Sequence, residues 1–221
     1  MRSRTDTGRL SDKPGRRSIV VVASILVALS TVRCQGSPTI VGFRFDEDAL
    51  VLPSAVLSAI GGPFTEAEAQ RIRDMSRREL ETAFAGLRLR VAEGADGNDG
   101  FWRVVVVQTL PNQGRLPNAG VALPLGPLGG TALVGTDIVA SEAARYAPPG
   151  ASRPTIIEGI GRGIGRVAAH EVAHQIVGPG GKHNDADEDS YEYSSPARAS
   201  QYYGELHWTV WWPDLQRKVG R

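Results

Sequence analysis

The order of apolar and polar residues predicts a helix early in the chain. Thr65 and Glu68 have the spacing of a capping box, in which each side chain accepts a hydrogen bond from a free amide group at the start of a helix. Apolar residues then recur at helical intervals on a charged background, at Ala69, Ile72, Met75, Leu80 and Phe84. We therefore expect a helix over about 65–85 that ends at Gly86.

After this helix the pattern changes to that of β-structure. Apolar residues alternate with others over 87–92, which predicts a half-buried strand. The β-branched run at 101–109 predicts a central strand, so that 87–109 would form a hairpin or two neighbouring strands. Residues 111–130 are rich in proline and glycine, as a surface loop is, and another short strand is expected over 131–139.

A long helix is predicted after a break at 146–150. Pro154 suits the first turn of a helix, and the helical pattern runs to Val177. The first half contains four glycines, each of which costs about 1 kcal/mol relative to alanine; they are Gly159, Gly161, Gly163 and Gly165. We attribute them to tight packing of the helix against the sheet, and the alternative is a helix that begins near Ile164.

The last part of the chain predicts one more helix. Ser195 and Pro196 suit the N-cap and the first position of a helix over about 196–212. Four of its residues would share one face: Tyr203, His207, Val210 and Trp211. His207 is therefore expected to be a packed, hydrogen-bonded core histidine and not a metal ligand.

The N-terminal region has the composition of an export signal. A polar, basic stretch is followed by an apolar run over 19–32, which is shorter than the about 20 residues that span a membrane. Arg16 and Arg17 resemble the paired arginines of a twin-arginine signal. We therefore expect residues 1–36 to be a signal segment and 37–221 to be a domain that works outside the cytoplasm, secreted or in the cell envelope.

The single cysteine, Cys34, excludes an intramolecular disulfide. It stands where a bacterial lipoprotein carries its lipidated cysteine, although Arg33 occupies a position at which that pattern has a small residue. Cleavage and release is the first expectation, a lipid anchor the second and an uncleaved anchor the third. Contact with a membrane is expected only in the last two cases.

The overall composition is that of a globular protein. Hydrophobic residues make up 41% and charged residues 22% of the chain, and the formal net charge is +1. The basic residues do not form a stripe, so we expect no nucleic-acid partner. We also expect a monomer.

The chemistry is concentrated in the histidines, which all lie in the last quarter of the chain. On a helix, His170 and His174 are separated by about 40° around the axis, so both rings can reach one ion. Glu171 is rotated by about 100° from His170 and can reach a water molecule on such an ion. Gly178 can end the helix and allow His183 to fold back, and three neutral imidazoles and a water molecule would form a tetrahedral catalytic site.

The sequence His170-Glu171-x-x-His174, followed by Gly178 and His183, resembles the motif of the zincin metallopeptidases and of their metzincin branch. The usual metzincin pattern is HExxHxxGxxH, in which the third histidine follows the second by 6 positions; here the separation is 9 (183 − 174). Asp185 is the first substitute for His183 as third ligand. In the glutamate-ligand zincins that role falls to a downstream glutamate, which would be Glu192 or Glu205.

Metzincins also have a turn with a methionine beneath the zinc, often followed two residues later by a tyrosine. The chain has only Met1 and Met75, so Tyr191 would take the place of that methionine. Tyr193 would match the tyrosine that, in some metzincins, ligates the metal or contacts the transition state.

The resemblance implies an α+β, zincin-like fold. A small mixed β-sheet would pack on a helix and on the active-site helix in an N-terminal subdomain, 37–178. A short C-terminal subdomain, 179–221, would end in a helix. A peptide could add to the free edge of the strand at 131–139.

The implied function is that of a secreted zinc endopeptidase. Zn²⁺ would be held by His170, His174 and His183, and Glu171 would act as general base with Tyr193 as a catalytic partner. The substrate would be a peptide or protein. The alternative is an inactive, zinc-stabilised extracellular binding module, but a purely structural zinc site has no use for Glu171.

Overall fold

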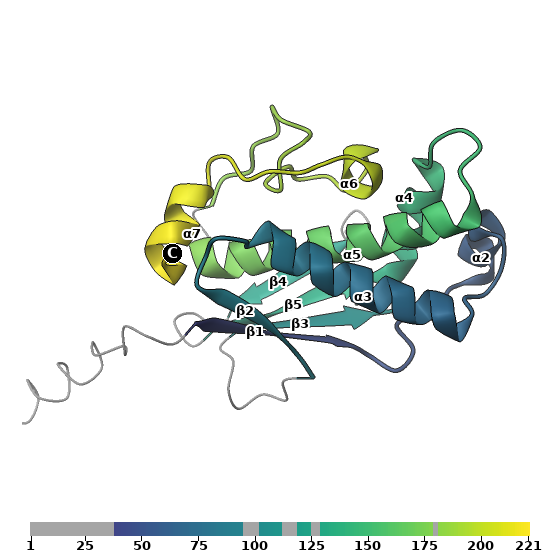
Figure 1. Ribbon diagram of the computed structural model, residues 1–221, viewed down its shortest axis with the longest axis horizontal. Coiled ribbons are helices and arrows are strands. Elements are labelled where there is room, and N and C mark those ends of the chain that lie inside the picture. The colour runs from purple at the N-terminus through teal and green to yellow at the C-terminus, as the bar shows by residue number, and fades with distance from the viewer. Residues whose placement is uncertain (1–37, 95–101, 112–118, 125–128, 179–180) are drawn as a thin grey trace, which may run out of the picture. The chain divides into compact units, whose positions relative to one another are not determined.

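The computed structural model describes residues 38–94, 102–111, 119–124, 129–178 and 181–221 (Figure 1). The expected signal segment 1–36, including Cys34, lies outside these residues. Parts of the expected loop 111–130 also lie outside them.

A five-stranded sheet forms one layer of the fold. Its strands are β1 (Thr39–Phe45), β2 (Leu89–Glu93), β3 (Trp102–Val107), β4 (Gly120–Pro124) and β5 (Gly130–Gly135). Their order is β2-β1-β3-β5-β4, and all neighbours are parallel except β4 and β5, which are antiparallel. The expected mixed sheet is therefore confirmed, with β3 in its centre.

Two predictions about the strands were wrong. The segment 87–109 forms no hairpin and no pair of neighbours, because β1 lies between β2 and β3 and pairs in parallel with both. The expected loop 111–130 contains β4, an edge strand that needs pairing on one side only and that the surrounding prolines and glycines concealed.

The strand expected over 131–139 ends early, at Gly135. The buried Thr136 starts a helix there, and its hydroxyl group donates to the backbone carbonyl group of Ala49 and lies 3.2 Å from that of Val107. The hydrogen bond from this side chain takes the place of the backbone hydrogen bond that a further strand residue would make.

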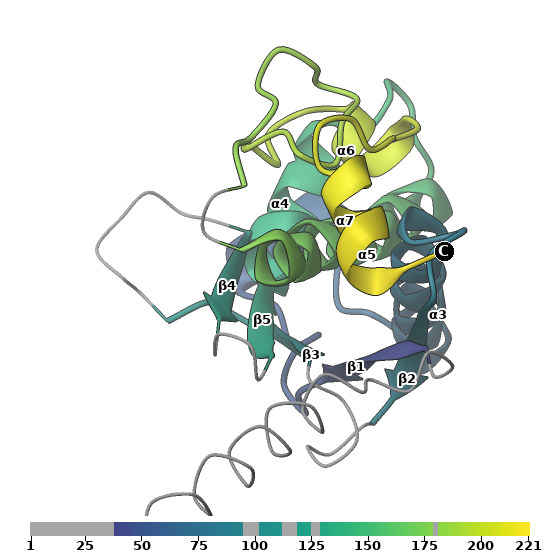
Figure 2. The same ribbon diagram turned by 90° about the vertical axis from the view of Figure 1, so that its left-hand side faces the viewer.

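Helices make up the other regular elements of the described residues, and the two longest of them cover one face of the sheet (Figure 1). The helices are α2 (Ser54–Ile60), α3 (Glu66–Ala83), α4 (Thr136–Arg145), α5 (Arg153–Val177), α6 (Ser200–Tyr203) and α7 (Trp212–Val219). In two views, α3 and α5 lie side by side on the same face of the sheet (Figures 1 and 2). None of the helices in the described ranges is long and apolar enough to cross a bilayer.

The start of α3 confirms the predicted capping box. The amide of Thr65 donates to Glu68 Oε2 at 2.8 Å, and the amide of Glu68 donates to Thr65 Oγ1 at 3.2 Å. One face of the helix is buried, as its periodicity predicted.

The glycines of α5 face other helices, and the predicted packing against the sheet was wrong for them. The helix is continuous from Arg153, which also excludes a start near Ile164. Gly161 and Gly165 face α3, whereas Gly159 and Gly163 face the tyrosines of α6. Each pair is four residues apart, so each forms one smooth stripe that lets a neighbouring helix approach closely.

Gly165→Ala is expected to destabilise the protein, although alanine favours a helix by about 1 kcal/mol. A Cβ atom at this position would lie 2.3 Å from the backbone oxygen of Ser76, so α3 and α5 would have to separate. We expect a loss of about 2–3 kcal/mol in the free energy of unfolding, measured by urea denaturation. Gly161→Ala, whose nearest contact is the side chain of Met75 at 2.7 Å, is the control and should lose less. A Gly165→Ala protein as stable as the wild type would contradict this packing.

The first residue of α5 links that helix by hydrogen bonds to the first turn of α3 and to the segment before it. Arg153 donates from Nε to Glu68 Oε1 at 2.7 Å and from Nη2 to Glu68 Oε2 at 3.0 Å. It also donates to the carbonyl groups of Ile60 and Pro63, at 2.6 and 2.7 Å. The hydrogen bond from Arg153 is the main cause that lowers the pKa of Glu68 from 4.5 to about 2.

This ion pair predicts an acid-dependent contribution to stability. Because the pKa of Glu68 is lower in the folded state, its stabilising effect is complete above about pH 5 and disappears as the pH falls from 4.5 toward about 2. Glu68→Gln should therefore be less stable than the wild type at pH 7, and the difference should shrink over that range. Denaturation midpoints measured between pH 7 and pH 2 test this. A difference that does not change with pH would show that the charge of Glu68 does not matter.

The C-terminal region differs from its prediction. Instead of one helix over 196–212 there are the short α6 and α7, joined by an extended segment. Helix α6 ends at Gly204, whose backbone is extended (φ −91°, ψ −164°). The buried Arg166 of α5 donates at this point to the carbonyl groups of Ser200 at 2.7 Å and Gly204 at 3.0 Å, and these contacts hold the chain where it leaves α6.

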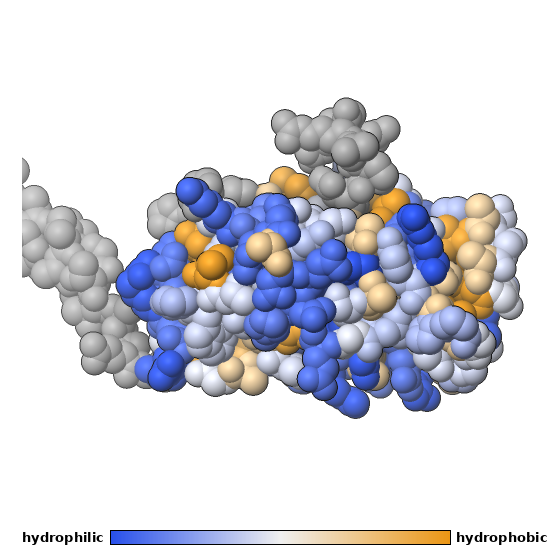
Figure 3. Space-filling model, turned by 90° about the horizontal axis from the view of Figure 1, so that it is seen from above, coloured by the Kyte–Doolittle hydropathy of each residue, from blue (hydrophilic) through white to orange (hydrophobic). Residues whose placement is uncertain are grey.

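His207 is therefore no core histidine. It is exposed, and its Nε2 lies 3.0 Å from Asp187 Oδ2. The face of the molecule that is seen from above in Figure 3 is mainly hydrophilic, with apolar side chains in small groups. Such a surface is ordinary for a face in contact with water.

Candidate metal centre

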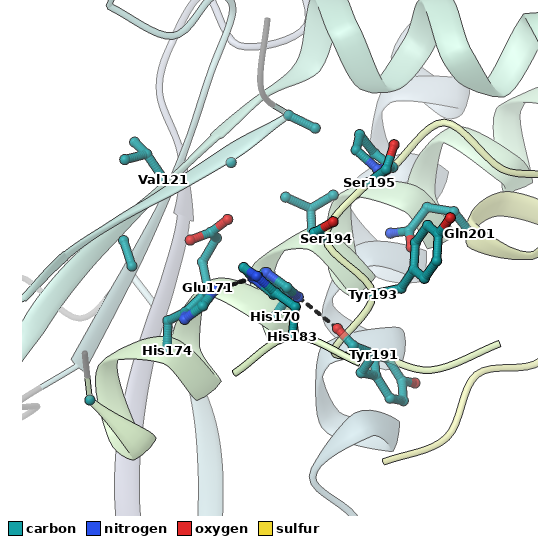
Figure 4. A pocket seen from close by; sticks show the side chains of 16 residues that line it. Val121, His170, Glu171, His174, His183, Tyr191, Tyr193, Ser194, Ser195 and Gln201 are labelled. Atoms are coloured by element: carbon teal, nitrogen blue, oxygen red, sulfur yellow. Dashed lines mark hydrogen bonds between the residues drawn. The ribbon is translucent and has the colours of Figure 1, made fainter. Parts of the chain in front are cut away.

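Three histidines meet at the C-terminal end of α5. His170 and His174 project from one face of the helix, and His183 returns from the segment after it (Figure 4). Their Nε2 atoms are 3.0 Å apart between His170 and His174, and also 3.0 Å apart between His174 and His183. The structure thus brings together all three histidines that the sequence predicted as ligands.

The hydrogen-bond contacts of the three rings leave nitrogen lone pairs free for a bound cation. His170 Nδ1 lies 2.6 Å from the carbonyl oxygen of Tyr191, which can only accept, so Nδ1 carries the proton and Nε2 has a free lone pair. His174 Nε2 has two neighbours but at most one proton, so it cannot donate to both. In a tetrahedral site with bonds of about 2.0–2.1 Å, ligand nitrogens are about 3.3 Å apart, close to the observed spacing. The three imidazoles therefore fit a divalent ion such as Zn²⁺.

The protonation of the rings agrees with this interpretation. Burial, together with the positive charge of His174, lowers the pKa of His170 to about 3. Burial and His183 lower the pKa of His174 to about 4. Both rings are therefore neutral near pH 7, the form in which histidine binds metals.

An indole ring packs against the histidine cluster. The ring centroid of Trp211 lies 4.7 Å from that of His174, 5.5 Å from that of His170 and 5.9 Å from that of His183. Its Nε1 donates to the carbonyl group of Lys182 at 2.8 Å. Trp211 thus restrains all three rings, whereas Tyr191 contributes its carbonyl group and stacks its own ring on Trp208.

A buried carboxylate holds Trp211 in place. Glu192 is fully buried and accepts from the amide of Trp211 at 2.7 Å and from the amide of Thr209 at 2.9 Å. The hydroxyl groups of Ser190 and Thr209 also donate to it. Four hydrogen-bond donors around one carboxylate fix the segment that carries Trp211.

The other acidic candidates lie outside the histidine cluster. Glu192 is occupied by the donors just described, and Glu205 is exposed. Asp185 is exposed as well and accepts from the amide of Ser194 at 2.9 Å. In this arrangement His183 supplies the third nitrogen that could bind a metal ion.

Glu171 lies beside the cluster and is 8% exposed. The amide of Ala122 in β4 donates a hydrogen bond to its carboxylate. Burial outweighs this bond and raises the pKa of Glu171 to about 8. The carboxyl group of Glu171 is therefore buried beside the three imidazoles, within the pocket that they line, where it could exchange a proton with a water molecule on a bound ion.

The edge strand comes unusually close to this carboxylate. A Cβ atom at Gly120 would lie 2.7 Å from Glu171 Oε1 and 2.6 Å from Val167 Cγ1. Only glycine therefore allows β4 to pass over α5 at this point. This role of β4 was not predicted, because its only signal in the sequence is the pattern Gly-Val-Ala-Leu at 120–123.

A pocket of about 460 Å³ contains the three histidines and Glu171. One side is formed by 119–122, at and before β4, and the other by Tyr191 and 193–196 (Figure 4). Tyr193 lines this pocket, with the guanidinium group of Arg198 4.6 Å from the centre of its ring. The prediction that the strand at 131–139 has a free edge for a peptide was wrong, because β5 is internal and β4 is the edge strand.

Comparisons with protein-family models and with curated proteins found no match to this chain.

Proposed function

We propose that the protein is a zinc-dependent endopeptidase of the zincin type, with a divergent, metzincin-like site. The observation that carries this proposal is the position of Glu171, which is buried in the same pocket as three converging imidazoles. A site that only stabilised the fold would not need a buried carboxylate there.

The metal would be held by Nε2 of His170, His174 and His183. A zinc ion with three imidazole ligands lowers the pKa of a bound water molecule toward about 7 and polarises a carbonyl group that it contacts. Glu171 would accept the proton of that water at its carboxylate and pass it to the leaving amine. Its bond from Ala122 and its closeness to Gly120 restrict the movement of this side chain.

The peptide would lie along β4. This strand pairs with β5 on one side and has no strand on its other side within the described part of the sheet. An extended peptide can add to such an edge through backbone hydrogen bonds, which would place its carbonyl groups in the pocket beside Glu171. Tyr193, which the pocket wall presents from the opposite side, is the proposed donor to the developing oxyanion.

The test is the cleavage of a mixed peptide library, with the products read by mass spectrometry. Protein loaded with zinc should cut peptides, and protein stripped with a chelator should not until zinc is restored. A folded protein that holds one zinc ion and makes no cuts would contradict the proposal and favour a zinc-stabilised binding module.

We also propose that the protein acts outside the cytoplasm, on the basis of the signal-like pattern of residues 1–36. N-terminal sequencing of protein recovered from the medium or envelope of an expressing cell tests this. A full-length chain that stays in the cytoplasm would contradict it.

A further inference from the structure

The pocket continues beyond the histidines to a second group of polar residues. Figure 4 shows Tyr193 and Gln201 on the side of the histidines opposite to Val121 of β4. Gln201 is 5% exposed, belongs to α6 and lines the pocket. A buried amide at this place is available to a side chain that enters from the metal site.

The orientation of the Gln201 amide is determined by its neighbour. Arg198 Nη2 lies 3.0 Å from Gln201 Oε1. Because a guanidinium group can only donate, the atom that it contacts must be the amide oxygen. The NH₂ group of Gln201 is therefore left for the pocket, and it has no hydrogen-bond partner among the residues that the structure describes.

Arg198 also places a positive charge behind this amide. It is 5% exposed, and its Nε and Nη1 have no hydrogen-bond partner in the described part of the chain. Its Nη2 donates to the carbonyl group of Ser190, and its guanidinium group lies against the ring of Tyr193. The nearby acidic residues Glu188 and Asp189 are exposed and form no ion pair with it. A buried cation without a bound anion makes this end of the pocket favourable for negative charge.

We propose that this end of the pocket selects a peptide side chain that ends in an oxygen acceptor, and that it prefers the carboxylate of glutamate or aspartate. The inference rests on the proposed peptidase function and assigns its substrate class. The NH₂ group of Gln201 donates to the side chain, and Arg198 contributes charge without direct contact. An apolar side chain would leave the amide unpaired, and a lysine or arginine would be repelled by Arg198.

The first arm of the test uses cleavage of a random peptide library by the zinc-loaded protein. Acidic and amide residues should occur next to the cut at least about tenfold more often than leucine or lysine, and the acids more often than the amides. Gln201→Leu should still cut but should lose this preference in favour of leucine. Gln175→Leu is the matched control and should keep the wild-type preference. Gln175 is also 5% exposed on α5, its amide has no partner among the described residues, and it does not line the pocket.

The second arm separates failure of this inference from failure of the peptidase proposal. Immobilised zinc-loaded protein with Glu171→Gln is incubated with the same library, and the retained peptides are sequenced. Retention of acidic peptides that Gln201→Leu abolishes would support the selectivity even if the wild type cuts nothing. Cuts without an acceptor preference, or no retention of acidic peptides by a protein that does not cut, would overturn the inference.

Discussion

Replacing Glu171 with glutamine is expected to leave zinc binding intact and to lower peptide hydrolysis by about 10²–10⁴-fold. Glutamine has nearly the same shape as glutamate and can still accept the amide of Ala122, so β4 should keep its place above the pocket. What it cannot do is accept a proton. The loss should therefore appear in kcat, with little change in KM.

The control for this variant is the same substitution elsewhere on α5. Glu158 pairs with Arg71 on the surface and does not line the pocket, so Glu158→Gln should retain full activity. Zinc content is measured on the same samples by mass spectrometry of the metal. Turnover by Glu171→Gln within a few-fold of the wild type would contradict the role of Glu171, whereas loss of zinc would show that this residue holds the site together.

Replacing His174 with alanine is expected to remove the metal. His174 is the middle donor, 3.0 Å from the donor atoms of both His170 and His183, so its loss leaves two imidazoles with no ring between them. Changes in residues that only support a ligand weaken metal binding by about 10–100-fold, so the loss of a ligand should exceed about 100-fold. Bound zinc should fall from about one ion per chain to almost none after dialysis.

His207→Ala serves as the control, because His207 is exposed and pairs with Asp187 outside the cluster. It should keep its zinc. Titration calorimetry gives both affinities, and the rise in melting temperature on adding zinc should occur for the control and disappear for His174→Ala. Equal zinc affinity in the two variants would show that the cluster is not the metal site.

Features that depend on near neighbours in the chain could be predicted from the sequence. The capping box of α3 involves residues three positions apart, and the face of α5 that carries His170 and His174 follows from helical periodicity alone. The relation of Glu171 to these histidines has the same local origin. Helix geometry is set by the backbone, so these positions needed no knowledge of the rest of the fold.

Strand order depended on partners far away in the sequence. β2 and β3 follow each other in the chain, yet β1 lies between them, and nothing within 87–109 indicates this. Likewise, α6 ends at Gly204, where the guanidinium group of Arg166 in α5 donates to the carbonyl oxygens of Ser200 and Gly204. Local propensity for a helix over 196–212 was overridden by this buried contact.

The candidate site also combines features set by near neighbours in the chain with features set by distant segments. The sequence by itself determined how His170, Glu171 and His174 are placed relative to one another, because a helix presents these positions at known angles. Only the tertiary structure decided that His183 completes the cluster, that Trp211 lies against it, and that β4 and Gln201 form the walls of the pocket. These residues come from separate segments that meet only when the core packs, and the contact energy that brings them together has no periodic signature in the chain.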